Sequence, residues 1–471
     1  MKNQKVFVMG HKNPDTDSIC SAIAYADIKN RTTQTKRYIP RRAGQINEET
    51  QYVLNRFGVQ PPAYLGNIGT QVKDMDIRPK PDADRTMSLK NAWDMMQNKG
   101  IVTLPICNSE DELEGIVTIG DIADVYMDTK DSYLLSNART QYNKIRDTLD
   151  GEIVEGNGHG YFTKGKILIG TADPEVMKNY IEENDMVILG NREEDQLKAI
   201  ELNVSCIIVG MSIQVSEKVI KKAQERQIII ISSPYDTYTI ARMINQSIPV
   251  NYVMKKDNLV TFNTEDFTDD IQDVMIKHRH RAFPVINKRG KCVGTISRRN
   301  FLDMHKKQVI LVDHNEKDQA VDNIEKAEIL EIIDHHKLGS LETMKPINFR
   351  NEPVGCTATI LYRIYDEQRL EIPPKIAGLL CAAIISDTLM FRSPTCTQQD
   401  KIAASALALI ADIKIEDFAR EMFKAGSNLK DKAPEEIFYQ DYKKFIAEGN
   451  VAFGVGQISS MDEEELQEIK V

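Results

Sequence analysis

The sequence predicts an α/β protein in which a lobe built on a parallel sheet is split by a long insert. Three observations carry this prediction: apolar runs that end in aspartate and histidine, a pattern that recurs at a fixed offset, and alternating apolar and helical segments between its two copies. At 471 residues the chain also exceeds the roughly 250 to 300 residues at which single cores stop growing. We therefore expect several domains.

Apolar runs at 5–9, 308–315 and 329–336 are typical of buried parallel strands. The first is followed by GHKNPDTDS and then ICSAIAYADIKN, which indicates a loop and a helix that Asp17 or Ser18 can cap. Each run delivers polar residues at the carboxyl end of its strand. Open α/β sheets bind ligands at this edge, so a site is expected there.

An internal repeat lies between the first and second of these strands. Its anchors keep one offset of 179 residues, with Met75, Pro105 and Gly115 recurring as Met254, Pro284 and Gly294. The aligned pieces LPICNSEDELEGIVTIGD and FPVINKRGKCVGTISRRN resemble a pair of CBS domains, modules that often bind adenine nucleotides. CBS pairs generally associate with another pair, so the resemblance implies a homodimer.

The segment between the repeats alternates strands such as DMVILG, VSCIIVG and QIIIIS with helices, as small α/β domains do. It resembles the DRTGG domain, although the name-giving motif is absent. The predicted division is 1–67 (first part of the catalytic lobe), 68–130 (first CBS domain), 131–247 (DRTGG-like domain), 248–306 (second CBS domain), 307–423 (second part of the lobe) and 424–471 (hinge and start of a further lobe).

Composition argues against several classes of protein. The net charge of -10 and the lack of a long basic run disfavour a nucleic-acid-binding protein. Seven scattered cysteines without a C-x-x-C pair fit neither a zinc ribbon nor a disulfide framework and suggest a reducing cytosol. Because Asp387 interrupts the most apolar stretch, 377–391, we expect a cytoplasmic protein without a membrane span.

Histidines and carboxylates concentrate at the three predicted strand ends. Only eight histidines occur in the chain, and four lie in these motifs. The full set is His11, Asp15, Asp17, Asp313, His314, Asp334, His335, His336 and, from AIISDTLMF, Asp387. Converging carboxylates repel one another unless cations lie among them, so the motifs predict bound metal.

Imidazole mixed with carboxylates and without thiolate favours Mn²⁺ or Co²⁺ over structural zinc or Mg²⁺. Two such ions with a bridging carboxylate form the clamp used for phosphoryl transfer to water, in which a metal-activated hydroxide attacks. Each piece also has a simpler interpretation. Asp17 alone can be a helix cap, and Asp334 can orient His335 rather than bind metal.

The motifs GHKNPDTDS, VDHNE, IDHHK, EPVGCTATI and ISDTLMFRSPTCTQQD, in this order, resemble the family II inorganic pyrophosphatases of the DHH superfamily, including the subgroup with inserted CBS domains. The resemblance implies hydrolysis of inorganic pyrophosphate, with Mg²⁺ accompanying the substrate. It assigns His11 and Asp15 to one metal, assigns Asp17, His335 and Asp387 to the second, and makes Asp313 the bridge. His336 then faces the substrate, and His314 has no ligand role.

The CBS resemblance extends to nucleotide-binding residues. Thr118 and Asp121 match the pattern of a hydroxyl for phosphate and an acid for ribose. In the second copy Ser297 keeps the hydroxyl, Asn300 replaces the acid, and Arg298 and its neighbour can meet phosphates or form a solvated basic pair. AMP, ADP or ATP is the expected regulator, with inhibition by AMP or ADP.

The C-terminal segment resembles the beginning of the family's second, DHHA2-like lobe. KAGSNLKDK at 424–432 matches the hinge and Lys443 the first substrate lysine, but no S-R-K-K-like motif follows. An incomplete lobe predicts weakened turnover, because losing one electrostatic partner typically costs about 10² to 10³ in rate. Two alternatives therefore stand beside the pyrophosphatase: a nucleotide sensor with lost catalysis, and a DHH phosphodiesterase acting on short nucleotides.

Overall fold

The structure is a computed structural model that describes residues 4–127, 131–302, 304, 306–427, 442–447 and 451–456. It divides into two compact units. The split unit comprises Met1–Thr70 and His305–Val471, and the inserted unit comprises Gln71–Met304. Each is described by itself below.

The split unit is built on a six-stranded sheet in which every pair of neighbours is parallel. The order across the sheet is β19 (Asn348–Asn351), β18 (Glu328–Asp334), β17 (Gln308–Val312), β1 (Val6–Met9), β2 (Tyr38–Arg42) and β3 (Ala63–Tyr64). The predicted parallel sheet is thus confirmed. Its central pair, β1 and β17, joins segments from either side of the insert, with Val6 opposite Gln308.

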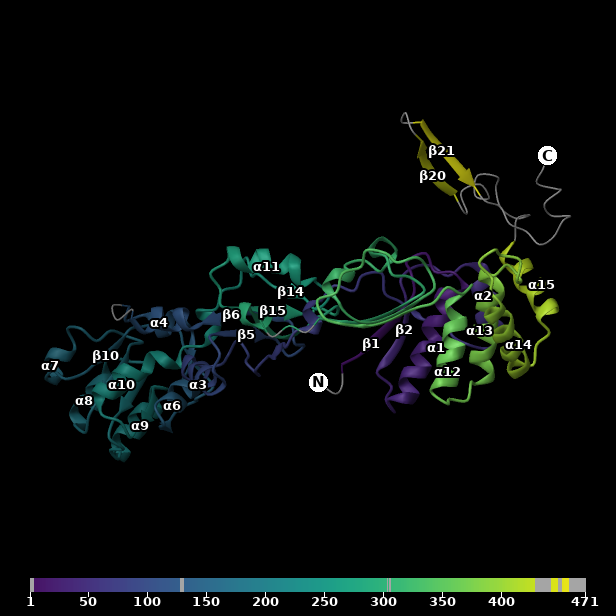
Figure 1. The fold of residues 1–471 in the computed structure, drawn as a ribbon. Helices are drawn as coiled ribbons and strands as arrows, with labels where there is room; N and C mark the ends of the chain where they lie inside the picture. The colour runs from purple at the N-terminus through teal and green to yellow at the C-terminus, as the bar shows by residue number, and fades with distance from the viewer. Residues whose placement is uncertain are drawn as a thin grey trace. The chain divides into compact units, whose positions relative to one another are not determined.

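Helices gather beside the sheet of the split unit (Figure 1). They are α1 (Thr16–Thr32), α2 (Glu48–Arg56), α12 (Thr357–Glu367), α13 (Pro374–Asp387), α14 (Gln398–Ala411) and α15 (Ile415–Gly426). α13 is apolar nearly all round because it packs against α1, α12 and α14 at once. A second, smaller core that includes Met9, Val309 and Leu311 contains the sheet residues that alternate with those of the first, such as Val8 and Ile310.

The inserted unit contains a five-stranded sheet of order β10 (Ile167–Ile169), β11 (Met186–Leu189), β12 (Cys206–Val209), β13 (Ile229–Ser232) and β8 (Glu152–Glu155). Only β8 runs antiparallel to its neighbour. β11 and β12 are wholly buried, with α8 (Glu193–Glu201) and α9 (Glu217–Glu225) packed together in the same domain. This is the small α/β domain that the alternating pattern predicts.

Two matching hairpins flank that domain in the sequence. β5 (Thr103–Cys107) and β6 (Leu113–Thr118) form one, and β15 (Ala282–Ile286) and β16 (Cys292–Ser297) form the other. All four strands keep the 179-residue offset at both ends, and each hairpin has its register shift at the equivalent step. α3 (Leu89–Lys99) and α11 (Thr268–Lys277) precede the hairpins at corresponding places. The predicted repeat is therefore confirmed.

The segments that lead into the repeats are exchanged. β4 (Arg78–Pro79) pairs antiparallel with β16 of the second hairpin, not with the first hairpin that follows it. Reciprocally, Lys255 bridges to Ile116 on β6, with Ile116 N–H donating to the Lys255 carbonyl at 3.0 Å. Each repeat therefore completes the sheet of the other, which ties the two into one body.

The last described strands are β20 (Tyr442–Ala447) and β21 (Val451–Gly456), an antiparallel pair. Lys443 lies on β20, opposite Val455, but its side chain falls outside the described residues, as do residues 428–432 of the predicted hinge. Among the helices that the structure describes, none has the length and apolar character needed to cross a membrane.

Candidate metal centre

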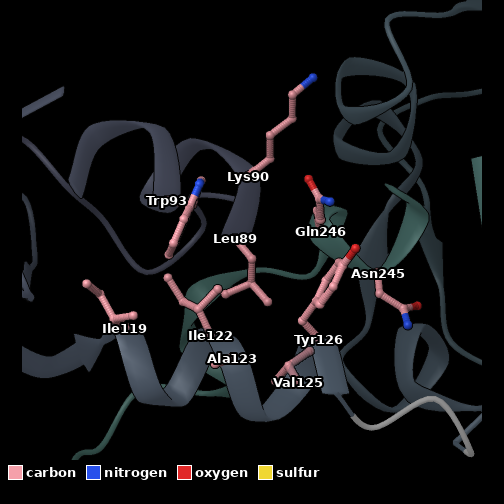
Figure 2. Close-up of a pocket in the computed structure, with 10 residues that line it drawn as sticks. All are labelled: Leu89, Lys90, Trp93, Ile119, Ile122, Ala123, Val125, Tyr126, Asn245 and Gln246. Atoms are coloured by element: carbon pink, nitrogen blue, oxygen red, sulfur yellow. The ribbon is translucent and has the colours of Figure 1, made fainter. Parts of the chain in front are cut away.

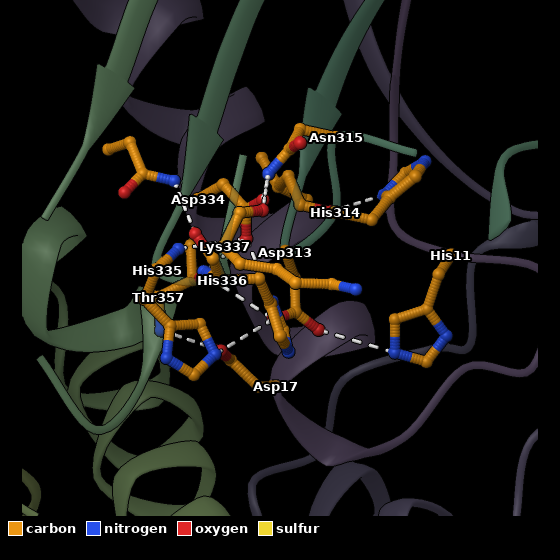
Figure 3. A network of polar contacts seen from close by, with 12 residues as sticks. His11, Asp17, Asp313, His314, Asn315, Asp334, His335, His336, Lys337 and Thr357 are labelled. Carbon is orange, nitrogen blue, oxygen red and sulfur yellow. Dashed lines mark hydrogen bonds and ion pairs between the residues drawn. The ribbon is translucent and has the colours of Figure 1, made fainter. Parts of the chain in front are cut away.

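Polar residues from five elements converge at the carboxyl edge of the central strands (Figure 3). The loop after β1 brings His11, the residue after β17 is Asp313, and the residues after β18 are His335 and His336. The start of α1 carries Asp15 and Asp17, and α13 ends at Asp387. The three motifs that are distant in sequence thus meet at one edge, as parallel strands require.

Three groups of side chains lie close enough to hold a metal ion, with the candidate ligand atoms of each group within 4.8 Å of one another. They are His11–Asp15–Asp313, Asp17–Asp313–His335–Asp387 and Asp313–His335–His336. Asp313 belongs to all three. Its Oδ2 lies 3.4 Å from His11 Nε2, and its Oδ1 lies 3.4 Å from His335 Nε2, so its two oxygens face opposite parts of the cluster.

The hydrogen bonds of His335 indicate what the cluster accommodates. Its Nδ1 lies 3.1 Å from the Val354 carbonyl, which only accepts, so in the neutral ring Nδ1 carries the proton and Nε2 the lone pair. That lone pair faces Asp313 and, at 3.7 Å, Asp387 Oδ2. His335 Nε2 and Asp313 Oδ2 are buried and make no hydrogen bond to any described residue. A cation among these electron-rich atoms satisfies them all, so the donor set fits Mn²⁺ or Co²⁺.

Without cations the cluster crowds several carboxylates together, and the pKa values of its side chains respond to that negative charge. Burial disfavours the charged form of His11, yet Asp15 and Asp313 outweigh it and raise its pKa to about 10. Burial likewise opposes protonation of His335, but chiefly Asp313 raises its pKa to about 9. Burial and the charge of Asp313 raise the pKa of Asp17 to about 7, and burial with Asp17 raises that of Asp387 well above its usual value. Protons occupy the places that cations would otherwise take.

Asp15, not Asp17 or Ser18, is the N-cap of α1, so the predicted cap is wrong. Asp15 Oδ1 accepts from the Ser18 backbone at 2.9 Å, while Oδ2 faces His11. Ser18 Oγ instead accepts from the His11 backbone. Asp17 is fully buried and accepts from the backbone N–H groups of Thr357 and its successor at the start of α12. A helix N-terminus favours a carboxylate there, which offsets part of its burial.

The backbone around the cluster is strained at residues that are not glycine. Asp313 has φ +64°, a left-handed conformation that costs of order 1–3 kcal/mol. Leu389, Met390 and Phe391, just after Asp387, also have positive φ values of 47° to 64°. The sequence gives no warning of either, because glycine, which marks such positions, is absent from both.

Asp334 orients His336 rather than His335. Its Oδ1 lies 2.9 Å from His336 Nδ1, and its Oδ2 accepts from the Asn315 amide (Figure 3). His336 Nε2 is thereby left free of the proton in the neutral ring, and the side chain is 49% exposed. His314 is fully buried with Nδ1 2.9 Å from the Val312 carbonyl, and burial lowers its pKa to about 4. It packs as a neutral ring against His11.

A cavity of about 300 Å³ opens beside the cluster, lined by His11, Lys12, Asn13, Asp318, Gln319 and His336. Its lining residues follow the three strands that carry the motifs: His11, Lys12 and Asn13 follow β1, Asp318 and Gln319 follow β17, and His336 follows β18. The lining includes two side chains that can carry positive charge beside an anion, Lys12 and His336.

In the inserted unit, the predicted nucleotide residues mostly bond to one another. The Thr118 backbone N–H and Oγ1 both donate to Asp121 Oδ2, at 2.7 and 2.6 Å. Ser297 makes the same two bonds to Asn300 Oδ1, at 2.7 and 2.8 Å. Arg298 donates to the backbone carbonyls of three residues, Met275, His278 and His280. These side chains therefore already have structural roles.

Two cavities nevertheless adjoin these motifs. One, of about 380 Å³, is lined by Val102, Thr103, Thr118, Ile119, Gly120, Lys255, Arg279, His280 and Arg281. The other, of about 350 Å³, includes Arg78, Arg281, Ser297, Arg299 and Asn300 in its lining. Both contain cations that sequence reasoning missed, because Arg78, Lys255, Arg279 and Arg281 lie outside the aligned motif. Arg299 of the second cavity lies within the motif and is the neighbour of Arg298 named above. A third, largely apolar cavity of about 370 Å³ lies between α3 and α4 (Ile119–Met127), with Trp93, Ile122 and Tyr126 around it (Figure 2).

Comparison with known proteins gives the geometry its context. The DHH family, N-terminal domain, matches residues 5–384, and the DHHA2 domain matches residues 420–471. A Clostridium perfringens protein named "Cobalt-dependent inorganic pyrophosphatase" is 43% identical over 465 residues, which are 99% of this chain and 84% of that protein. This chain belongs to the DHH family of manganese- and cobalt-dependent inorganic pyrophosphatases.

Other members are also similar to this DHH-family chain. A Thermotoga maritima protein named "Probable manganese-dependent inorganic pyrophosphatase" is 35% identical over 460 residues, 98% of this chain and 83% of that protein. Among solved structures, the CBS and DRTGG domains of the regulatory region of C. perfringens pyrophosphatase, complexed with the activator diadenosine tetraphosphate, are 35% identical. The match covers 49% of this chain and 100% of the chain in that structure, with a TM-score of 0.47.

Proposed function

We propose that this chain hydrolyses inorganic pyrophosphate to two phosphates at the cluster around Asp313. One observation carries the proposal: a buried carboxylate common to three candidate metal groups faces a histidine nitrogen whose lone pair has no other partner. Family membership and the names of the relatives supply the substrate.

The ligand assignment is part of the proposal. His11 and Asp15 hold one cation, while Asp17, His335 and Asp387 hold the second. Asp313 contributes one oxygen to each. When bound, two divalent cations neutralise the phosphates and acidify a water molecule at this site. The Val354 carbonyl and the α12 N-terminus fix the orientation of His335 and Asp17, so the ligand set is arranged before any ion binds.

The substrate is proposed to occupy the cavity beside the cluster. Lys12 and His336 line it, and Asp334 keeps the His336 ring oriented with Nε2 toward the open side. A protonated His336 donates to a phosphate oxygen, and its pKa is raised chiefly by the bond to Asp334. Lys443 on β20 is proposed as a further phosphate contact, with Mg²⁺ accompanying the substrate.

Phosphate release from pyrophosphate, measured with Mn²⁺ or Co²⁺ and after treatment with EDTA, tests this function. We expect release that requires the metal. A dinucleotide supplied as the alternative substrate separates the DHH phosphodiesterase: faster cleavage of the dinucleotide would replace the present proposal. No release from either compound, together with tight AMP binding, would favour the nucleotide sensor.

We also propose that AMP, ADP or ATP binds in the two basic cavities of the inserted unit and changes the rate. Arg78, Arg281 and Arg299 supply cations that suit phosphates, and Arg281 lines both cavities. Thr118, Asp121, Ser297 and Asn300 are proposed to shape the cavities, with Arg298 as a support behind them. Calorimetry with AMP and phosphate release at several AMP concentrations test binding and inhibition together.

A homodimer is proposed through the apolar face of α3 and α4. Trp93 and Tyr126 on this face are 40% and 43% exposed, although such side chains are usually buried (Figure 2). Analytical ultracentrifugation tests the proposal. Ala123→Glu, in the middle of the face, is expected to yield monomers, whereas Met344→Glu in the split unit should leave the dimer intact.

A further inference from the structure

Glu49 is a partly buried carboxylate next to the metal cluster that belongs to none of the three candidate groups. It is the second residue of α2. Its Oε1 accepts two hydrogen bonds, one from Thr16 Oγ1 at 2.7 Å and one from Ser386 Oγ at 2.5 Å. A single oxygen therefore joins the first residue of α1 to the penultimate residue of α13.

Both partners are chain neighbours of proposed metal ligands. Thr16 lies between Asp15 and Asp17, and Ser386 directly precedes Asp387. Asp17 and Asp387 belong to the same four-residue group, so one ligand atom of each lies within 4.8 Å of the other. Like charges at this distance repel, whereas the two bonds at Glu49 hold the two helix ends together.

We propose that Glu49 is a positioning residue that sets the separation of Asp17 and Asp387 by anchoring Thr16 and Ser386 to one oxygen atom. The inference rests on the metal centre of the proposed function. The simpler alternative is that Glu49 only stabilises α2, since acids in a first turn favour the helix dipole. That role is already served by the N-cap Asn47 and by Glu48, and it requires no contact with α1 or α13.

Glu49 also connects the cluster to α15, the helix in which the DHHA2 match begins. α2 packs against α15, and Tyr52 of α2 donates to Glu421 of α15 at 2.6 Å. A Cβ added to Gly426, at the end of α15, would lie 2.9 Å from the Cβ of Glu49. Gly426 of α15 therefore packs directly against Glu49.

The test compares Glu49→Ala with Glu49→Gln, using Co²⁺ as the probe and the full chain. The glutamine keeps an oxygen that can accept both hydroxyls, and the alanine removes it. We expect the alanine to weaken Co²⁺ binding about 10- to 100-fold, the usual cost of losing a group that orients metal ligands, and to change the visible Co²⁺ absorption. The glutamine should bind Co²⁺ within a few-fold of the parent, with the parent spectrum.

Glu331→Ala is the matched control. Glu331 also links α1 to a ligand-bearing element, β18, by accepting from Lys29 Nζ at 2.5 Å and from Tyr25, but neither of these donors is a chain neighbour of a proposed ligand. Its loss is expected to leave Co²⁺ binding and the spectrum unchanged. Gly426→Ala should act like a mild Glu49→Ala, because it displaces the same side chain.

Two results would overturn the inference: parent affinity and spectrum in Glu49→Ala, or equal defects in the alanine and glutamine variants. If Glu49→Ala does not fold, Ser386→Ala and Thr16→Val decide the same question by removing the donors, and unchanged Co²⁺ binding in both would reject the role. Co²⁺ binding is measured without substrate. A chain that binds Co²⁺ but releases no phosphate would therefore reject the proposed function and leave this test intact.

Discussion

The metal cluster and the two repeat motifs differ in whether their polar atoms already have partners. Thr118 and Asp121, and likewise Ser297 and Asn300, satisfy each other with the same pair of bonds. In the cluster, by contrast, Asp313 Oδ2 and His335 Nε2 are buried without a hydrogen bond to any described residue. Buried polar atoms are rarely left so, which makes the unmet pair the stronger sign of a ligand.

The comparison also explains why similar motifs deserve different weight. The repeat motif closes a local turn through its own hydrogen bonds, so its residues alone do not define a binding site. The cations around it, at Arg281 and Arg299, are the better guide. The following four predictions probe this difference.

Asp313→Asn is expected to have the largest effect. An amide keeps the shape but places an N–H group where one oxygen stood, so it cannot serve both proposed ions. Pyrophosphate hydrolysis should fall by at least about 10² to 10³, with loss of bound Mn²⁺. Asp334→Asn disturbs the hydrogen bonds of Asp334 to His336 and Asn315 but removes no proposed ligand, so it should cost less, about 10- to 100-fold. Equal effects would contradict the central place given to Asp313.

Metal binding should depend steeply on pH. Without metal, His11 has a pKa of about 10 and His335 of about 9, so both rings carry a second proton at neutral pH. Metal ions must displace these protons, so the apparent affinity rises with pH and falls as pH is lowered, by about tenfold per pH unit for each proton released. Equilibrium dialysis with Mn²⁺ between about pH 6 and 9 measures the slope, and a flat profile would count against both ligands.

Nucleotide affinity should depend on Arg281, which lines both basic cavities, rather than on Arg298 of the repeat motif. Arg281→Ala is expected to weaken AMP binding about 10- to 100-fold, since a charged hydrogen bond to phosphate is worth about 1.5–3 kcal/mol. Arg298→Ala, the control, removes a side chain bonded to backbone carbonyls and should change AMP affinity little. Calorimetry distinguishes them, and the reverse order would restore the motif interpretation.

The smallest effect is expected where the two repeats are alike. Thr118→Ala and Ser297→Ala each remove a hydroxyl bonded to the residue three places on, and each should lower the free energy of unfolding by about 1 kcal/mol. Trp93 is the single tryptophan and lies on α3, so its fluorescence in urea follows the inserted unit. A much larger loss in one repeat would show that the motifs are not equivalent.

Local patterns explain what the sequence predicts well. Each strand end and each copy of the repeat is a short run of contiguous residues, so the sequence predicts the parallel sheet, the hairpins and the gathering of His11, Asp313 and His335. Contacts between distant segments have no such local pattern. The anchoring of Thr16 and Ser386 by Glu49, and the exchange of β4 onto the second hairpin, depend on packing that no short motif encodes.

The sequence also gives no sign of the unusual backbone conformation at the cluster. Asp313 adopts a left-handed conformation without being glycine, because its backbone N–H is held by the Ile333 carbonyl at 2.9 Å and its side chain by the cluster. The predicted cap of α1 is wrong because neighbouring residues offer the same chemistry. Asp15, Asp17 and Ser18 are all good caps, and only the fold decides which of them faces the helix.

The ends of the insert leave the split unit side by side. Ile68 N–H donates to the Asp322 carbonyl at 3.0 Å, and Lys307 Nζ donates to the Gly69 carbonyl at 2.9 Å. The segment that leads into the insert is therefore hydrogen-bonded to the part of the chain that follows the insert. Closing a longer loop between these segments adds little entropy cost, since that cost grows only with the logarithm of loop length. Genetic gain or loss of a whole module at this point therefore leaves the pairing of β1 with β17 untouched.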